Sequence, residues 1–167
     1  FNGCTSLATV EFGKNSVLTT IVNDVFYNCS SLTTITIPEG VQEIGSAAFR
    51  GCTSLETINI ASTVTTLGAN LFRECANLKE VNFGANSALT TIENHVFYGC
   101  QSLATFDIPD SVISMGTSVF HGCTSLTSIE VPDGIEALGS NVFRDCQSLT
   151  SITFGANSAL TTIEKEA

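Results

Sequence analysis

FYNCSSLTTITIPEGVQEIGSAAFRGC, residues 26–52, contains one full turn of the motif that decides the fold. It begins and ends on Phe-x-x-Cys, at Phe26/Cys29 and again at Phe49/Cys52. The pair occurs seven times in the chain, and successive phenylalanines lie 25, 23, 23, 25, 23 and 23 residues apart. A period in the twenties is typical of a solenoid, in which each repeat is one coil that buries its apolar face against its neighbours.

Within one coil the hydrophobic spacing changes twice. In residues 26–32 Phe, Cys and Leu stand three apart, which predicts a short helical turn. Residues 35–37 then alternate apolar and polar, as a strand with one buried face does, and the Pro-Glu-Gly of 38–40 predicts a turn. A second short extended stretch follows at 41–44. We expect a solenoid of about seven coils, with a parallel β-sheet, short second strands and short helical turns.

Glycine follows the second extended stretch in four coils, at Gly45, Gly68, Gly116 and Gly139. Glycine adopts positive φ at no steric cost, so we interpret these four residues as corners of the coil.

All seven cysteines belong to the repeat. Stacked coils about 4.8 Å apart would align them as one ladder in the core: Cys4, Cys29, Cys52, Cys75, Cys100, Cys123 and Cys146. That spacing is within reach of a disulfide, but the side chains would point in parallel and their number is odd. A thiophilic metal is disfavoured, because no CxxC pair occurs and no histidine lies beside the ladder. Free buried thiols are the preferred interpretation, and on it Cys75→Ser should cost about 1–3 kcal/mol through an unpaired hydroxyl.

A longer period of 71 residues lies over the short one, since Phe1, Phe72 and Phe143 each open a longer coil. Residues 83–93 and 154–164 are the same string, FGANSALTTIE, which indicates duplication of a three-coil block. Residues 1–167 are therefore expected to form a single solenoid. Because the chain opens within a repeat, we interpret it as an internal fragment without caps.

Composition excludes several partners. Apolar residues make up 43 % of the chain and charged residues 13 %, with a net charge of −10 and a pI near 4.3. An acidic surface argues against nucleic acid and against docking on an anionic membrane. No apolar run approaches the roughly 20 residues that a membrane helix needs, so we expect no membrane insertion.

The position directly after each phenylalanine forms the first candidate site, which we call the turn stripe. Its residues should point outward because phenylalanine points inward, and arginine and tyrosine dominate binding hot spots. Cation–π pairs between neighbouring coils are possible, and Glu74 and Asp145 could neutralise the arginines so that the stripe merely covers an edge. The turn stripe consists of Tyr27, Arg50, Arg73, Tyr98, His121 and Arg144.

The outward side of the predicted strands forms the second candidate site, the strand-face row. Its side chains are small, polar or acidic, and none is aromatic. A partner there would be held by hydrogen bonds and bridging water. The alternative is that the row is simply a solvated face. The strand-face row consists of Glu11, Thr36, Asn59, Asn82, Asp107, Glu130 and Thr153.

Catalytic chemistry is not indicated. His95 and His121 are isolated in the sequence, no Ser/His/Asp set has a convincing neighbourhood, and no glycine-rich phosphate loop occurs. We therefore predict no enzyme activity, no catalytic residues, no metal site and no cofactor.

Residues 32–55 closely match the pattern L-x-x-I-x-I-P-x-x-V-x-x-I-G-x-x-x-F-x-x-C-x-S-L. This resembles the BspA-like, Treponema-type leucine-rich repeats, and the resemblance spans the chain, although the three longer coils lack the proline and glycine. It implies that the predicted coils form a right-handed leucine-rich-repeat array. It also implies a cell-surface or extracellular adhesion module that binds protein or glycan partners on host, matrix or neighbouring cells. A structural module that self-assembles end to end through uncapped ends is the alternative.

Overall fold

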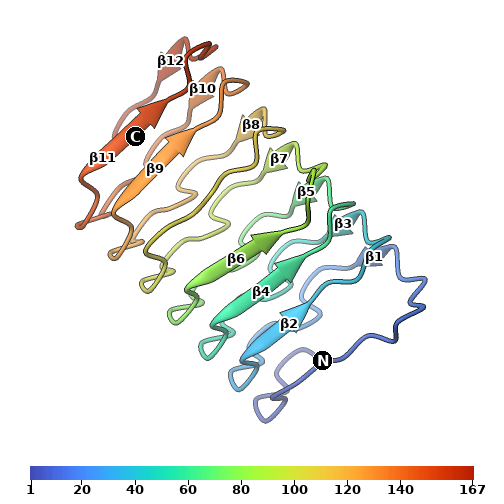
Figure 1. Ribbon diagram of the computed structural model, residues 1–167. Coiled ribbons are helices and arrows are strands. Elements are labelled where there is room, and N and C mark those ends of the chain that lie inside the picture. The colour runs from blue at the N-terminus through green and yellow to red at the C-terminus, as the bar shows by residue number, and fades with distance from the viewer.

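The computed structural model describes residues 1–167 and winds them into a stack of coils, with the two termini at opposite ends (Figure 1). Its strands form two rows. The longer strands are β2 (Thr34–Thr36), β4 (Thr57–Ile60), β6 (Glu80–Phe83), β9 (Ser128–Val131) and β11 (Ser151–Phe154). The two-residue strands are β1 (Thr20–Ile21), β3 (Glu43–Ile44), β5 (Thr66–Leu67), β7 (Thr91–Ile92), β8 (Ser114–Met115), β10 (Ala137–Leu138) and β12 (Thr162–Ile163).

Every strand pairs in parallel with the equivalent strand of a neighbouring coil, which confirms the predicted solenoid with its short second strands. The long strands form the sheets β2-β4-β6 and β9-β11, and the short ones form β1-β3-β5-β7-β8 and β10-β12. Register follows the repeat, so that Ile35 pairs with Ile58 and Ile58 with Val81. Each row of strands is therefore interrupted once, in the part of the chain between β6 and β10.

The Phe-x-x-Cys-x-x-Leu segment differs from the prediction of a helical turn, because the structure contains no helix. Instead, separate turns follow one another: the Cys29 amide donates to the Phe26 carbonyl, and the Leu32 amide donates to the Cys29 carbonyl. Three-residue spacing suits such successive turns as well as it suits a helix. None of the elements is a helix long and apolar enough to cross a bilayer.

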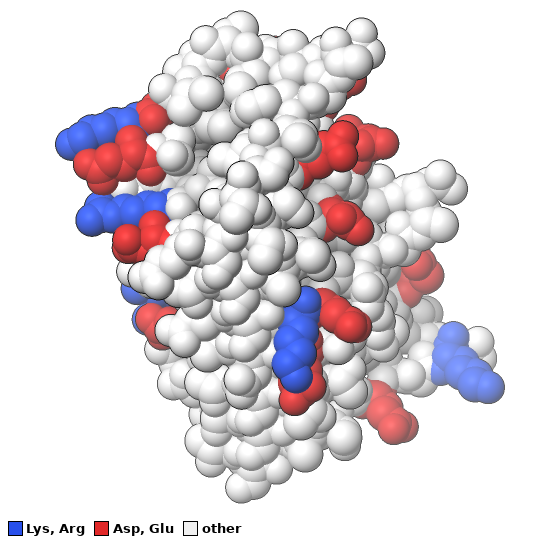
Figure 2. Space-filling view, turned by 60° about the vertical axis from the view of Figure 1, so that its left-hand side comes forward, with Lys and Arg blue, Asp and Glu red and all other residues white.

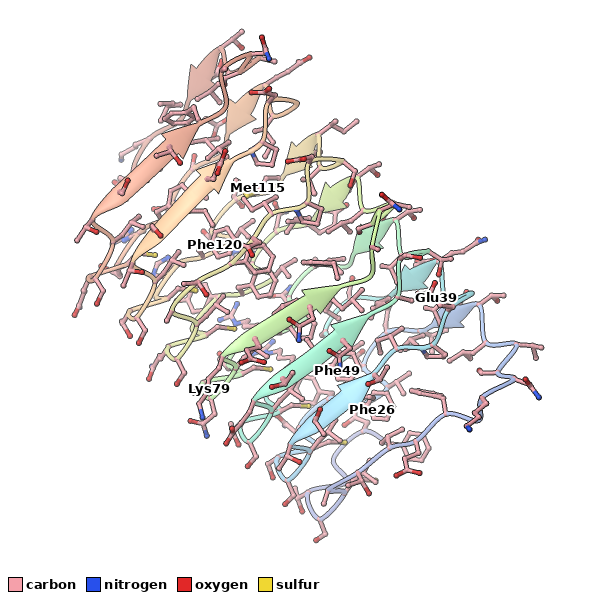
Figure 3. The ribbon with its side chains drawn as sticks, viewed as in Figure 1. Phe26, Glu39, Phe49, Lys79, Met115 and Phe120 are labelled. Atoms are coloured by element: carbon pink, nitrogen blue, oxygen red, sulfur yellow. The ribbon has the colours of Figure 1, made fainter.

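Stacked phenylalanine rings run through the interior along the axis of the molecule. Neighbouring rings are nearly parallel, with centroids 5.1 to 5.7 Å apart and interplanar angles of 1° to 15°. Phe26, Phe49 and Phe120 lie between the two rows of strands in Figure 3 and are buried. One continuous core of 41 buried apolar residues extends along the stack.

The four glycines after the short strands do not have positive φ, so their interpretation as corners was wrong. A Cβ on Gly68 would lie 2.6 Å from the backbone carbon of Gly45 in the preceding coil. Glycine is needed here because two backbones approach closely. Positive φ occurs instead two residues before and two residues after the phenylalanine, as at Asp24 and Asn28 around Phe26.

The backbone hydrogen bonds that the residues around each phenylalanine donate to another coil point toward the next coil. The Phe26 amide donates to Ala48 of the next coil, and the Phe49 amide donates to Leu71 of the coil after it. Along the short strands the direction is reversed, since the Gly68 amide donates back to Ile44 of the preceding coil. Except between β8 and β10, neighbouring coils are thus held together on both sides of the core.

Candidate binding surfaces

The strand-face row begins as a ladder of hydrogen-bonded side chains. The Asn59 amide nitrogen donates to the Thr36 hydroxyl at 3.1 Å, and the Asn82 amide nitrogen donates to the Asn59 oxygen at 3.1 Å. The three residues come from adjacent strands β2, β4 and β6, whose apolar neighbours turn into the core. Each amide still has hydrogen-bonding capacity toward solvent, because an amide group offers two donors and two lone pairs.

Beyond Asn82 the strand-face row is not continuous. Asp107 is exposed but belongs to no strand, and Glu11 lies in the first coil, where only a single bridge between Thr9 and Thr34 forms. Glu130 and Thr153 are in register again on β9 and β11. The structure therefore places all seven predicted residues on the strand side, as two ordered groups separated by Asp107.

Two of the hollows on this side of the molecule have appreciable volume. One, of about 560 Å³, lies over the first two coils and includes Thr9, Phe12 and Glu39. The other, of about 480 Å³, lies between the segment that carries Asp107 and the end of β9. Neither contains a histidine or cysteine, and no group of three His, Cys, Asp or Glu residues in the structure is arranged to hold a metal ion.

The turn stripe is brought together as an array of stacked side chains. The Arg73 guanidinium lies 4.5 Å from the centre of the Tyr98 ring, and that ring stacks on His121 at 4.6 Å. Arg50 similarly lies over Tyr27, with its guanidinium carbon 5.7 Å from the ring centre. The predicted cation–π pairs are thus confirmed, whereas the stacking of His121 on Tyr98 was not foreseen.

Two carboxylates neutralise the arginines of the turn stripe, as the sequence suggested. Glu74 lies 3.2 Å from Arg73 and 3.6 Å from Arg50, so it bridges neighbouring coils. In Figure 2 blue side chains along one edge lie beside red ones, and much of the remaining face carries no charge. Most cations of the turn stripe are therefore already compensated within the chain.

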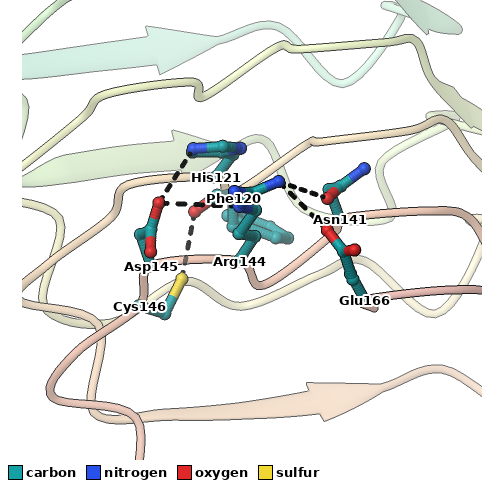
Figure 4. Close-up of polar contacts among 7 residues, drawn as sticks. All are labelled: Phe120, His121, Asn141, Arg144, Asp145, Cys146 and Glu166. Carbon is teal, nitrogen blue, oxygen red and sulfur yellow. Dashed lines mark hydrogen bonds and ion pairs between the residues drawn. The ribbon is translucent and has the colours of Figure 1, made fainter.

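The C-terminal end of the turn stripe is drawn in Figure 4. Asp145 lies 3.2 Å from the His121 ring nitrogen and 3.8 Å from Arg144. Arg144 also donates to Glu166 at 3.0 Å and to Asn141 at 3.4 Å. The two contacts with Glu166 and Asn141 were missed, because both residues stand outside the Phe-x-x-Cys motif.

His95 lies beside the turn stripe and has a shifted pKa. Partial burial, together with the positive charge of Arg73 and of His121, lowers the pKa of His95. Both causes favour the neutral form of the His95 imidazole.

Five cysteines of the predicted ladder lie in the core, Cys4 does not, and all seven thiols are free. Cys4 is exposed, Cys146 is half-buried and the other five are buried. Each thiol after the first donates to the phenylalanine carbonyl of the preceding coil, at 3.0 to 3.2 Å. A serine at Cys75 would find the same carbonyl, that of Phe49, so the expectation of an unpaired hydroxyl there was wrong.

Burial makes these thiols poor nucleophiles and poor ligands. It raises the pKa of Cys52 to about 12 and that of Cys146 to about 11, and it raises the pKa of Cys75 and Cys100 well above the ordinary value. Since the thiolate is the reactive form, the ladder is structural.

A parallel stack of short coils, each carrying one apolar ladder and one row of exposed polar side chains, defines a leucine-rich-repeat scaffold of the kind that presents a surface to partners. The sequence model of one protein family, the BspA type leucine rich repeat region, matches residues 1–88 and 84–167 of this chain, with six copies. The chain belongs to this family.

A solved structure shows the same fold. The chain is similar to the T. pallidum leucine rich repeat protein TpLRR, at 27 % identity and a TM-score of 0.71, over 89 % of this chain and 74 % of that one. It also matches a leucine-rich repeat protein from Eubacterium ventriosum, at 26 % identity and a TM-score of 0.47, over 83 % of this chain and 52 % of that one. Comparison with curated protein sequences finds no match.

Proposed function

We propose that the chain is a non-catalytic binding module of a cell-surface or secreted protein, and that it holds a protein or glycan partner on its strand-face row. The observation that carries this proposal is the ladder from Thr36 through Asn59 to Asn82, where hydrogen-bonding groups repeat at coil spacing on an exposed sheet. Proteins with BspA-type leucine-rich repeats are generally binding modules, which supports the same conclusion.

The strand-face row suits recognition because little inside the protein competes for its polar groups. No ion pair forms at any of its seven residues, and the internal hydrogen bonds of the ladder leave at least half of each amide free. Without aromatic anchors, a partner would be held by many weak polar contacts and bridging waters across several coils.

The turn stripe is the second proposed surface. Its arginines and tyrosines have the chemistry of hot spots, and they remain accessible at their outer edge although they stack on one another. A partner there would have to compete with Glu74 and Asp145 for the guanidinium groups. We therefore rank this surface behind the strand-face row.

A binding screen with two matched variants tests the proposal. The chain is immobilised and exposed to a glycan array and to a panel of extracellular-matrix proteins. The first variant combines Thr36→Ala, Asn59→Ala and Asn82→Ala, and the second combines Arg50→Ala, Arg73→Ala and Arg144→Ala. We expect the first to weaken binding about tenfold or more, because several cooperating contacts are lost, and the second to bind almost normally.

The possible outcomes separate the two surfaces. Loss of binding in the arginine variant alone would move the site to the turn stripe. Unchanged binding in both would remove both surfaces, and the absence of any ligand in the panels would count against a binding module of this kind. Melting temperatures of both variants should stay close to that of the parent, because exposed ion pairs and other surface side-chain contacts contribute little to stability.

End-to-end assembly is the second candidate function, and one observation favours it. The outermost coils expose apolar side chains of the core ladder, with Phe1 at 68 %, Phe154 at 43 % and Ile163 at 63 % of full exposure. Exposed apolar surface and open strand edges favour association with another copy. Light scattering during size-exclusion chromatography tests this: mass that rises with concentration supports assembly, and a constant monomer mass contradicts it.

A further inference from the structure

The strand face is broken at one segment, residues 105–108, in the coil between β6 and β9. No backbone hydrogen bond of the protein involves any of these four residues, as donor or as acceptor. In Figure 1 this part of the chain runs as a plain tube between β6 and β9, where the coils on either side carry arrows. Four consecutive peptide groups and the facing edges of two strands are thus left without partners.

Phe106 explains the break. At its repeat position the other six coils have valine or isoleucine, namely Val10, Ile35, Ile58, Val81, Ile129 and Ile152. The Phe106 ring is buried and packs 4.7 Å from Phe97 and 5.3 Å from Phe120, measured between ring centres. A ring where a branched aliphatic side chain would fit overfills the core and pushes the segment out of register with its neighbours.

Hollows open on both sides of the displaced segment. The hollow of about 480 Å³ lies toward β9 and is lined by Ile108, Glu130 and Val131, among others. A smaller one, of about 310 Å³, lies toward β6 and is lined by Val81, Phe83 and Asp107, among others. The larger volume falls within the range of known ligand pockets.

Four carboxylates surround the larger hollow, those of Asp107, Asp110, Glu130 and Asp133. None of them forms an ion pair with a lysine or arginine of the chain. Only Asp133 has an internal partner, the backbone amide of Asn157. The charge of this groove is therefore uncompensated, in contrast to the turn stripe.

We propose that this groove, bounded by residues 105–110 and 130–133, docks an extended, lysine- or arginine-bearing segment of a protein partner. The segment's main chain would pair with the free backbone groups of residues 105–108, and its basic side chains would meet the four carboxylates. This rests on the proposed binding function and deepens it, because it names a partner chemistry for one part of the strand side.

A peptide fits these observations better than a sugar or a metal ion does. Unpaired strand backbone is the template for strand addition, and neither a sugar nor an ion would satisfy a row of alternating amide donors and carbonyl acceptors. The carboxylates surround the hollow, but no three of them converge as metal ligands would. Complementary charge would speed association and select against acidic partners.

A peptide titration tests the proposal on the whole chain. The probe is a fluorescent peptide in which lysines alternate with valines, and its counterpart has glutamates in place of lysines. Fluorescence anisotropy should show saturable binding of the basic peptide and none of the acidic one. Amide hydrogen exchange at residues 105–108 should be fast in the free chain and slow in the complex.

Three variants distinguish binding of the peptide in the groove from its general attraction to an acidic protein. Asp107→Asn with Glu130→Gln should weaken binding of the basic peptide about tenfold. The matched pair Glu43→Gln with Glu93→Gln removes the same charge from the other row of strands and should change binding less than about twofold. Phe106→Ile leaves the charge unchanged, should slow exchange at residues 105–108 by restoring the ladder, and should also weaken binding about tenfold.

Each remaining outcome overturns the proposal. Equal losses in the two charge variants would mean non-specific attraction, and full binding by a Phe106→Ile chain with slowed exchange would place the peptide elsewhere. Saturable binding of calcium that displaces the peptide would make the groove a cation site. If the basic peptide does not bind while matrix proteins or glycans still depend on Asn59 and Asn82, this inference fails and the proposed function stands.

Discussion

At the scale of single residues, the backbone carbonyl of each phenylalanine has a role that the sequence pattern does not reveal. The Phe49 oxygen accepts from the Cys52 amide of its own coil and from the Cys75 thiol of the next. Both of its lone pairs are thus used in a buried position, where an unmade hydrogen bond is costly. Cysteine in the motif supplies small apolar bulk and, at the same time, a donor.

A pair of substitutions at Cys75 should separate these two contributions. Both Cys75→Ser and Cys75→Ala shrink the side chain, but only serine retains a donor for the Phe49 carbonyl. We expect the serine variant to have the larger free energy of unfolding, by about 0.5–1.5 kcal/mol, in chemical denaturation. An alanine variant as stable as the serine variant would show that the thiol contributes packing alone.

At the scale of elements, the short strands depend on how closely neighbouring coils approach. A Cβ on Gly68 would meet backbone atoms of Gly45 and Ser46 at 2.6 and 2.7 Å. At the equivalent Gly139 the nearest atom, the Gly116 carbonyl oxygen, would be 3.2 Å away. The difference agrees with the sheet topology, since β8 and β10 are not hydrogen-bonded to each other.

Gly68→Ala and Gly139→Ala therefore form a matched pair at one repeat position. Backbone atoms cannot move aside cheaply, so we expect Gly68→Ala to lower the free energy of unfolding by about 1–3 kcal/mol. Gly139→Ala should cost clearly less, because its neighbour has only to shift slightly. Urea denaturation of both variants measures this, and equal losses would contradict the wider spacing after β8.

Much of the fold could be predicted from the sequence because the repeat encodes it redundantly. The period, the inward ladders, the parallel pairing and the cation–π contacts of Arg50 and Arg73 all follow from residue type and spacing. The role of the glycines could not, since positive φ and close backbone approach both select glycine. The break at Phe106 was equally hidden, because phenylalanine satisfies the hydrophobic pattern and only its volume is unusual.

At the scale of the whole molecule, the stack consists of two well-bonded parts joined mainly on the turn side. Between β8 and β10 neither row of strands is continuous, yet Phe120 still donates to Val142 and Gly122 to Arg144. The phenylalanine stack also continues there, from Phe120 to Phe143 at 5.7 Å. The strand side at this junction is thus the part with the fewest restraints.

The cysteine ladder should make the whole fold sensitive to alkali. Unfolded thiols ionise near pH 9, whereas burial raises the pKa of Cys52 to about 12, so above pH 9 the unfolded state binds fewer protons. The stabilisation is complete below pH 9 and is lost as the pH rises toward 12, at about 1.4 kcal/mol per pH unit for each such thiol. Urea midpoints between pH 8 and 10.5 should fall steeply.

The Cys75→Ala chain is the control for this titration, because it lacks one shifted thiol and should show a shallower dependence. Urea midpoints that stay constant over the same range would contradict the buried, protonated state of the ladder.

The opposed hydrogen-bond directions on the two sides of the core have an electrical consequence. Peptide dipoles that point toward the C-terminal coils at Phe-x-x-Cys are offset by dipoles that point toward the N-terminal coils along the short strands. An α-helix accumulates partial charge at its ends because all its peptide units align. This array does not, so its polarity is set by side chains, and adding coils lengthens it without building a field along its axis.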